Sequence, residues 1–219
     1  MNQRILTIDI YSDVICPWCY VGKRRLERAL RQLGETVSAR VTWRPFQLNP
    51  AMPLEGMTRA AYLVAKFGSL DAYRRLEAQV TAAEPQLGWA FDKITVTPHT
   101  FAAHRLIWYA EASGKQDAMV ETLFRSYFVE GRHIGQSETL VEAAAQAGLR
   151  SDDVEAFLKG DDGVEQVQGE EAAGRRLGIR AVPCFVLNGA HALSGAQPAE
   201  VMVEAIRDVL AQQDARLAV

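Results

Sequence analysis

The 219-residue chain is 48% hydrophobic and 23% charged, a composition that is ordinary for a globular protein with a sizeable core. Its formal net charge of −3 and its evenly spread acidic and basic residues argue against nucleic-acid binding. The sequence has no apolar run near the ~18 residues of a membrane span, and the short segment interrupted by Thr7 and Asp9 does not resemble a secretory signal. We therefore expect a cytoplasmic protein with no membrane association.

The first 44 residues predict a β-α-β unit. Residues 4–10 alternate in polarity as a strand does, and apolar residues recur at helical spacing over 17–33. Pro17 suits the first turn of this helix, because its missing N–H would be unpaired there in any residue. Alternation over 37–43 then predicts a second strand.

The middle of the chain predicts helices from about residue 58 to residue 160. Thr97 and Pro98 indicate the N-cap and first turn of one helix, and Ser137 and Ser151 indicate the caps of two others. The predicted helices cover about 58–66, 71–84, 98–113, 116–130, 137–148 and 151–160.

The last part of the chain predicts a helix, a hairpin and a final helix. Helical spacing covers 163–177, and a short apolar strand follows over 181–187. Asn188-Gly189 is a strong signal for a hairpin turn, which leads into a return strand over 191–193. Pro198 then opens the last helix.

The order of these elements predicts the fold class. A β-α-β unit at the start and a β-β-α unit at the end form one split α/β domain, which the central helices interrupt. We expect one domain to consist of residues 1–50 and 163–219, with residues 51–162 as an all-helical insertion.

Cys16-Pro17-Trp18-Cys19 is the strongest chemical signal of the chain. A thiol is nucleophilic only as a thiolate, and the free N–H groups and positive dipole end of a helix start favour the thiolate of Cys16. Cys19 lies one turn into the helix, where it is shielded and suited to resolve a mixed disulfide. Trp18 offers an apolar contact beside the two sulfurs, whereas Lys23, Arg24 and Arg25 predict a solvated helix face.

Val182-Pro183 is the second notable pair. Proline cannot donate to a sheet ladder, so within a core-like strand it belongs at the strand start or after a cis peptide bond. Cys184 follows directly, and two interpretations stay open for it. It is a small buried hydrophobe, or it is a third thiol close enough to exchange with Cys16 or Cys19.

A metal site is a competing interpretation of the Cys-x-x-Cys pair. Structural zinc needs four ligands, usually from a second paired motif, and Cys184 would supply only a third. The histidines have no ligand spacing; they are His99, His104, His133 and His191. We expect no metal, and we interpret His104 as a packed or hydrogen-bonded histidine rather than an acid–base group.

Several linked motifs give the chain a resemblance to a known family. The strand, Cys-x-x-Cys helix and later Val-Pro strand resemble a thioredoxin fold, and the helical insertion resembles the DsbA family. More narrowly, four segments resemble its FrnE-like subfamily; they are Tyr11-Ser12-Asp13-Val14-Ile15-Cys16-Pro17-Trp18-Cys19-Tyr20-Val21-Gly22-Lys23-Arg24, Trp43-Arg44-Pro45-Phe46-Gln47-Leu48-Asn49-Pro50, Ala103-His104-Arg105-Leu106 and Ser194-Gly195-Ala196-Gln197.

The resemblance implies a site and a reaction. It implies a cis bond before Pro183, a Val182 backbone that pairs with substrate, and a proline loop that lies against the Cys-x-x-Cys pair. The implied function is protein dithiol–disulfide exchange, with Cys16 as nucleophile and Cys19 as resolving thiol. In a reducing cytosol, isomerase or reductase action is expected rather than net oxidation. The redox-active disulfide needs no further cofactor, and its substrates are protein or small thiols and disulfides.

Two other functional classes stay open. Kappa-class glutathione transferases and hydroxychromene carboxylate isomerases resemble the same inserted fold, but they typically carry serine in place of the first thiol. Ser194-Gly195 resembles a segment that can face glutathione in those relatives, which keeps glutathione as a candidate co-substrate. The remaining alternative is a thiol-bearing binding module. The insertion could form a peptide groove or a dimer surface, so both a monomer and a homodimer are consistent with the sequence.

Overall fold

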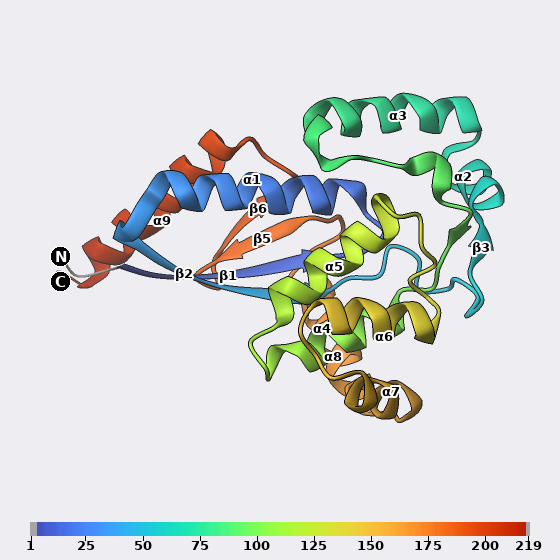
Figure 1. Ribbon diagram of the computed structural model, residues 1–219. Helices are drawn as coiled ribbons and strands as arrows, with labels where there is room; N and C mark the ends of the chain where they lie inside the picture. Colours follow the sequence, from blue (N-terminus) through green and yellow to red (C-terminus); the bar gives the residue numbers. More distant parts are fainter. Residues whose placement is uncertain (1–3, 218–219) are drawn as a thin grey trace.

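A four-stranded mixed sheet forms the centre of the computed structural model, which describes residues 4–217 (Figure 1). Its strand order is β2-β1-β5-β6, with β1 (Arg4–Ser12) parallel to β2 (Val37–Pro45). β5 (Cys184–Leu187) runs antiparallel to β1, and β6 (His191–Ser194) completes the hairpin. The β-α-β and β-β-α units therefore join in one sheet, which confirms the predicted thioredoxin-like α/β fold.

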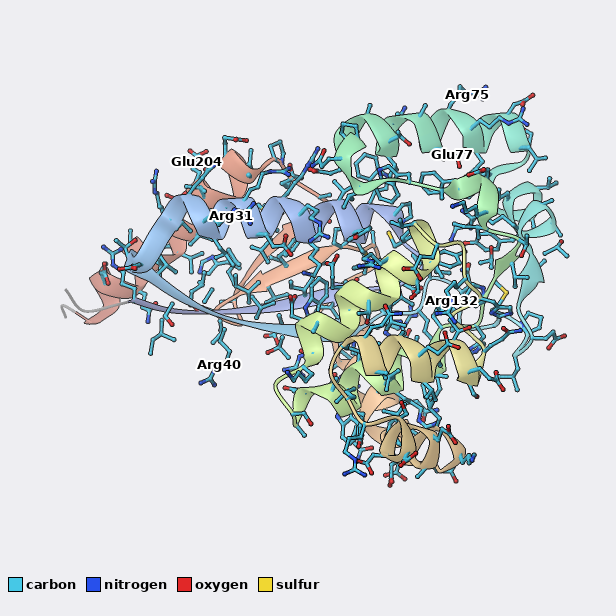
Figure 2. All side chains as sticks on the ribbon, viewed as in Figure 1. Arg31, Arg40, Arg75, Glu77, Arg132 and Glu204 are labelled. Carbon is cyan, nitrogen blue, oxygen red and sulfur yellow. The ribbon has the colours of Figure 1, made fainter. Side chains whose placement is uncertain are left out.

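Helices cover both faces of this sheet. α1 (Pro17–Leu33) and α9 (Ala199–Leu217) lie side by side on one face, and α8 (Val164–Arg176) lies on the other (Figure 1). Charged side chains such as Arg31 on α1 and Arg40 on β2 extend outward from these layers (Figure 2). Within residues 4–217, no helix combines the length and the apolarity that a membrane crossing would need.

The segment between β2 and α8 is largely helical, as predicted. Its helices are α2 (Arg59–Phe67), α3 (Leu70–Ala83), α4 (Phe101–Glu111), α5 (Gln116–Phe128), α6 (Ser137–Gln146) and α7 (Ser151–Lys159). Short 3₁₀ turns occupy Pro85–Leu87 and Phe91–Lys93 in this segment, and a third, Gly34–Thr36, joins α1 to β2. The division of the chain into residues 1–50 with 163–219, and 51–162, stays a prediction.

Three local predictions differ from the structure. The predicted cap Thr97 instead lies in β4 (Val96–Thr97), where it pairs with Met57 of β3 (Met57–Thr58), so α4 begins only at Phe101. Ser137 and Ser151 are the first helical residues rather than the caps, a shift of one position that is common at helix ends. The strand predicted from residue 181 begins at 184, because Pro183 has no N–H to donate to the ladder.

The two faces of the sheet pack into separate apolar clusters. The larger cluster joins β1, α1 and α9 to the helices α4–α6, and it contains Cys16 and Cys19. The smaller cluster lies on the α8 side; it consists of Tyr11, Phe46, Ile179, Cys184 and Val186. Since side chains alternate along a strand, Cys184 and Phe185 point to opposite faces.

Gly174 allows α8 to approach the sheet. A Cβ at this position would lie 2.3 Å from the Tyr11 ring, so Gly174→Ala should destabilise the fold by about 1–3 kcal/mol through overpacking. Gly169 is the matched control, because it is exposed in the same helix and its Cβ would meet nothing within 4 Å. Gly169→Ala should raise the unfolding free energy by up to about 1 kcal/mol. Urea denaturation checks both values, and equal effects of the two variants would contradict the packing argument.

Candidate functional site

The two cysteines of the Cys-x-x-Cys motif lie where β1 passes into α1. Cys16 is the N-cap of α1, and its N–H donates to the carbonyl of Asp13 at 3.0 Å. Pro17 starts the helix, as predicted, and the N–H of Cys19 donates to the Cys16 carbonyl at 3.0 Å. Cys16 is 6% exposed and Cys19 is 1% exposed. Cys16 is therefore the more accessible residue of the two, although both are buried.

The proline loop lies directly against the dithiol. The Val182–Pro183 peptide bond is cis, as the resemblance implied, and the Cys16 thiol donates to the Val182 carbonyl at 3.6 Å. Gly22 permits this approach, since a Cβ there would lie 3.0 Å from the Pro183 ring. The structure thus brings together residues that are more than 160 positions apart in the sequence.

The predicted glutathione-facing segment adjoins the same loop. The N–H of Gly195 donates to the Pro183 carbonyl at 2.8 Å, and Gly195 has a φ of +80° that favours glycine. Arg25 donates to the Ala196 carbonyl and lies 3.6 Å from the carboxylate of Glu84. Ser194 and Gly195 are therefore placed beside the proline loop.

The Cys19 thiol lies in an environment that disfavours ionisation. Burial raises its pKa well above the ordinary value, and the neighbouring Cys16 sulfur raises the pKa further. The Ser12 hydroxyl and the Asp13 backbone N–H act in the opposite direction, because they favour the thiolate. Cys19 is consequently a protonated thiol at neutral pH, and it must lose this proton before it can attack another sulfur.

Cys184 does not face the dithiol. It pairs with Tyr11 across the β1–β5 ladder and lies in the cluster on the α8 face, whereas Cys16 and Cys19 belong to the cluster on the other face. Burial also raises the pKa of the Cys184 thiol, which disfavours its reactive form. This position favours the interpretation of Cys184 as a small buried hydrophobe.

The basic residues that follow the motif are not a solvated face, so that prediction was wrong. Lys23 is only 4% exposed and forms ion pairs with Glu27 at 2.5 Å, Asp117 at 3.1 Å and Glu121 at 3.3 Å. Arg24 pairs with Glu27 and Glu121. These carboxylates compensate the cost of burying Lys23, and they tie α1 to α5.

A buried Asp–His pair lies next to the motif. Asp13 is fully buried; one of its carboxylate oxygens accepts a hydrogen bond from the Leu48 N–H at 2.7 Å, and the other lies 3.4 Å from Nε2 of His104. His104, on α4, is 3% exposed, in agreement with the expectation of a packed histidine. Sequence reasoning did not single out Asp13, although an aspartate directly before the apolar Val14-Ile15 is a signal that could have drawn attention to it.

No metal-binding group emerges from the described part of the chain. Across residues 4–217, no cluster of three or more His, Cys, Asp or Glu side chains is arranged to hold a metal ion.

Comparison with known proteins supports the fold. A family model described as the DSBA-like thioredoxin domain matches residues 7–207. The crystal structure of a probable DsbA oxidoreductase, SCO1869 of Streptomyces coelicolor, is 33% identical with a TM-score of 0.86, covering 93% of this chain and 89% of that chain. The structure of a 2-hydroxychromene-2-carboxylate isomerase is 18% identical with a TM-score of 0.68, covering 96% of this chain and 98% of its own. Among curated proteins, the uncharacterized protein YwbO of Bacillus subtilis (strain 168) is 26% identical over 204 residues, which are 92% of this chain and 96% of YwbO.

Proposed function

We propose that this chain, which belongs to the DSBA-like thioredoxin domain family, is a thiol–disulfide oxidoreductase that works through Cys16 and Cys19. The observation that carries the proposal is the Cys16 thiol at the start of α1, 3.6 Å from the Val182 carbonyl and next to a second, more deeply buried thiol. Cys16 is the N-cap of α1 and the less deeply buried cysteine of the pair, and burial keeps Cys19 protonated until it attacks.

The proposed reaction has two steps. The Cys16 thiolate attacks one sulfur of a partner disulfide, so that a Cys16–partner bond forms and the other partner sulfur leaves as a thiolate. Cys19 then loses its proton and attacks Cys16, which forms the Cys16–Cys19 disulfide and releases the second partner sulfur. Two electrons pass from the dithiol to the partner disulfide, and the reverse sequence oxidises a partner dithiol.

The residues around Cys16 supply the substrate contacts in this proposal. Pro183 shapes the groove beside the sulfur, and the backbone of Val182 pairs with an extended substrate segment. Trp18 is half-buried against the large apolar cluster, and it offers an apolar contact next to Pro17. We further propose a cytoplasmic, FrnE-like enzyme that acts as a reductase or isomerase on protein or small disulfides, as a monomer or homodimer.

Cys19→Ser tests the proposed roles. Without the resolving thiol, the Cys16–partner disulfide should accumulate, and mass spectrometry after acid quenching should detect it with a model peptide disulfide. Cys184→Ser is the matched control and should close the internal disulfide as the unmodified protein does. Trapping by Cys16→Ser instead of Cys19→Ser would reverse the roles. Full activity of both variants without any trapped species would contradict the proposal.

A glutathione-dependent isomerase or transferase is the second candidate. The hydrogen bond between Gly195 and Pro183 favours it, since Ser194-Gly195 lies beside the loop that faces Cys16. This alternative predicts tight glutathione binding and activity that survives the loss of Cys19. Titration calorimetry with glutathione, together with an activity assay of Cys19→Ser, separates the two functions. If glutathione is instead a co-substrate of the oxidoreductase, Cys19→Ser should still bind glutathione but should no longer form the internal disulfide.

A further inference from the structure

Three buried side-chain atoms beside the dithiol have no well-aligned nitrogen or oxygen partner within residues 4–217: Ser12 Oγ, Asp13 Oδ1 and His104 Nε2. Each residue is more than nine-tenths buried, with exposed fractions of 6%, 0% and 3%. An unpaired polar atom in a protein interior costs about 1–3 kcal/mol, so a cluster of three next to a reactive site calls for an explanation.

A small cavity connects two of these side chains. It has a volume of about 10 Å³, and its polar lining consists of Ser12, His104, Arg44 and Glu170. This volume suits one water molecule, which needs two or more polar partners, and the Ser12 hydroxyl and the His104 ring provide them. Arg44 and Glu170 form an ion pair at 2.8 Å and are 27% and 26% exposed, so the far wall of the cavity reaches solvent.

The same cluster contacts the buried thiol. The Ser12 hydroxyl and the Asp13 backbone N–H both act on the Cys19 sulfur in favour of its thiolate. On the other side, Asp13 Oδ1 lies 3.4 Å from His104 Nε2, so the two side chains face each other and can share a proton. Cys19 has almost no solvent access of its own, so its proton needs a path through the protein.

We propose that Ser12, Asp13 and His104 form the proton-transfer path of Cys19. The inference rests on the proposed function and specifies its second step. The Cys19 S–H gives its proton through the Ser12 hydroxyl and a cavity water to the Asp13–His104 pair. The Cys19 sulfur then bonds to Cys16, the bond between Cys16 and the partner sulfur breaks, and the partner leaves as a thiolate that takes a proton from solvent.

Several titratable and charged groups face His104 from the elements packed around it. Asp13 faces it from the β1–α1 turn, and His99 lies close enough to interact with both residues of the pair. Arg44 of β2 and Glu170 of α8 face it across the cavity. Burial raises the pKa of Glu170, which suits a group at the solvent end of a proton path.

The experiment separates the two chemical steps. The reduced protein is mixed with excess hydroxyethyl disulfide and quenched in acid, and mass spectrometry follows the mixed disulfide on Cys16 and the closed Cys16–Cys19 disulfide. The variants His104→Gln and Ser12→Ala are compared with His191→Gln, a control at the opposite end of the β5–β6 hairpin from the dithiol.

His104→Gln should leave the attack by Cys16 unchanged and slow closure of the disulfide by about 100-fold at pH 7, the size of a lost acid–base group. Its closure rate should rise about tenfold per pH unit, because hydroxide must then remove the Cys19 proton directly. Ser12→Ala should also slow closure, and the fold should tolerate it, because the oxygen that it removes has no nitrogen or oxygen partner within residues 4–217.

The outcomes distinguish this inference from the proposed function. If the Cys16–Cys19 disulfide closes at the normal rate and with the normal pH dependence in both variants, the proton path is overturned. The dithiol mechanism would then stay intact. Equal slowing of attack and closure would indicate a structural role of His104 and would also overturn it. A protein that forms no mixed disulfide even as Cys19→Ser would refute the proposed function itself.

Discussion

Cys16→Ser should abolish disulfide reduction, with a loss on the order of 1000-fold or more, because no other sulfur in the site can form the first mixed disulfide. Cys19 is buried and protonated, and Cys184 points to the opposite face of the sheet. Dithiol-driven reduction of insulin, followed by turbidity, measures this loss. Thermal unfolding of the variant should stay close to that of the unmodified protein, since a serine hydroxyl at this position can donate to the Val182 carbonyl, as the thiol does.

Cys184→Ser is the informative control for this prediction. It replaces a sulfur of similar burial, at 5% exposed against 6% for Cys16, but on the α8 face of the sheet. Its insulin reduction rate should equal that of the unmodified chain, while its stability should fall because a hydroxyl enters an apolar cluster. A rate loss comparable with that of Cys16→Ser would show that three sulfurs work in this site.

Glu171→Ala should lower the unfolding free energy by about 3 kcal/mol at pH 7, the second large effect that we expect. Its carboxylate accepts hydrogen bonds from the backbone N–H of Gln47 at 3.0 Å and from the Gln47 side chain at 2.9 Å. Arg175 donates a third at 2.8 Å. The substitution would leave the buried Gln47 N–H unpaired and would release the segment after β2 from α8.

The same contacts make this contribution dependent on pH. Burial alone would raise the pKa of Glu171, but the donors of Gln47 and the charge of Arg175 outweigh burial and hold the pKa below its usual value. The contribution of Glu171 to stability is therefore complete above the pKa of this carboxyl in the unfolded chain, ~4.3. It is lost as the pH falls through the lower pKa of the folded state. Urea denaturation at several pH values should show the difference between Glu171→Ala and the unmodified protein shrinking below pH ~4.

Glu165→Ala provides the control within the same helix. Glu165 is exposed near the start of α8, so its removal should change the unfolding free energy by less than about 0.5 kcal/mol at every pH. A Glu171→Ala difference that stays constant down to acid pH would argue against a depressed pKa of the buried carboxylate.

The sequence by itself determined the order and type of the main elements and the place of the reactive pair. Polarity alternation in β1 and β2, helical spacing in α1 and the Asn188-Gly189 turn are local signals, which act between neighbours in the chain. Cys16 and Cys19 were placed at a helix start for the same reason, since Pro17 marks that start locally. The subfamily and the roles of the site residues stay predictions.

Only the tertiary structure decided what each of these residues faces. Thr97 has the local signature of a helix cap, but its pairing with Met57, 40 positions earlier, holds it in a strand. Lys23 belongs to a run of basic residues that predicted a solvated helix face, but three carboxylates from α1 and α5 surround it. The register of β5 against β1 turns Cys184 away from the dithiol, and the packing of α4 brings His104 to Asp13. Such contacts join residues that are distant in the chain, and local patterns of polarity and spacing carry no information about them.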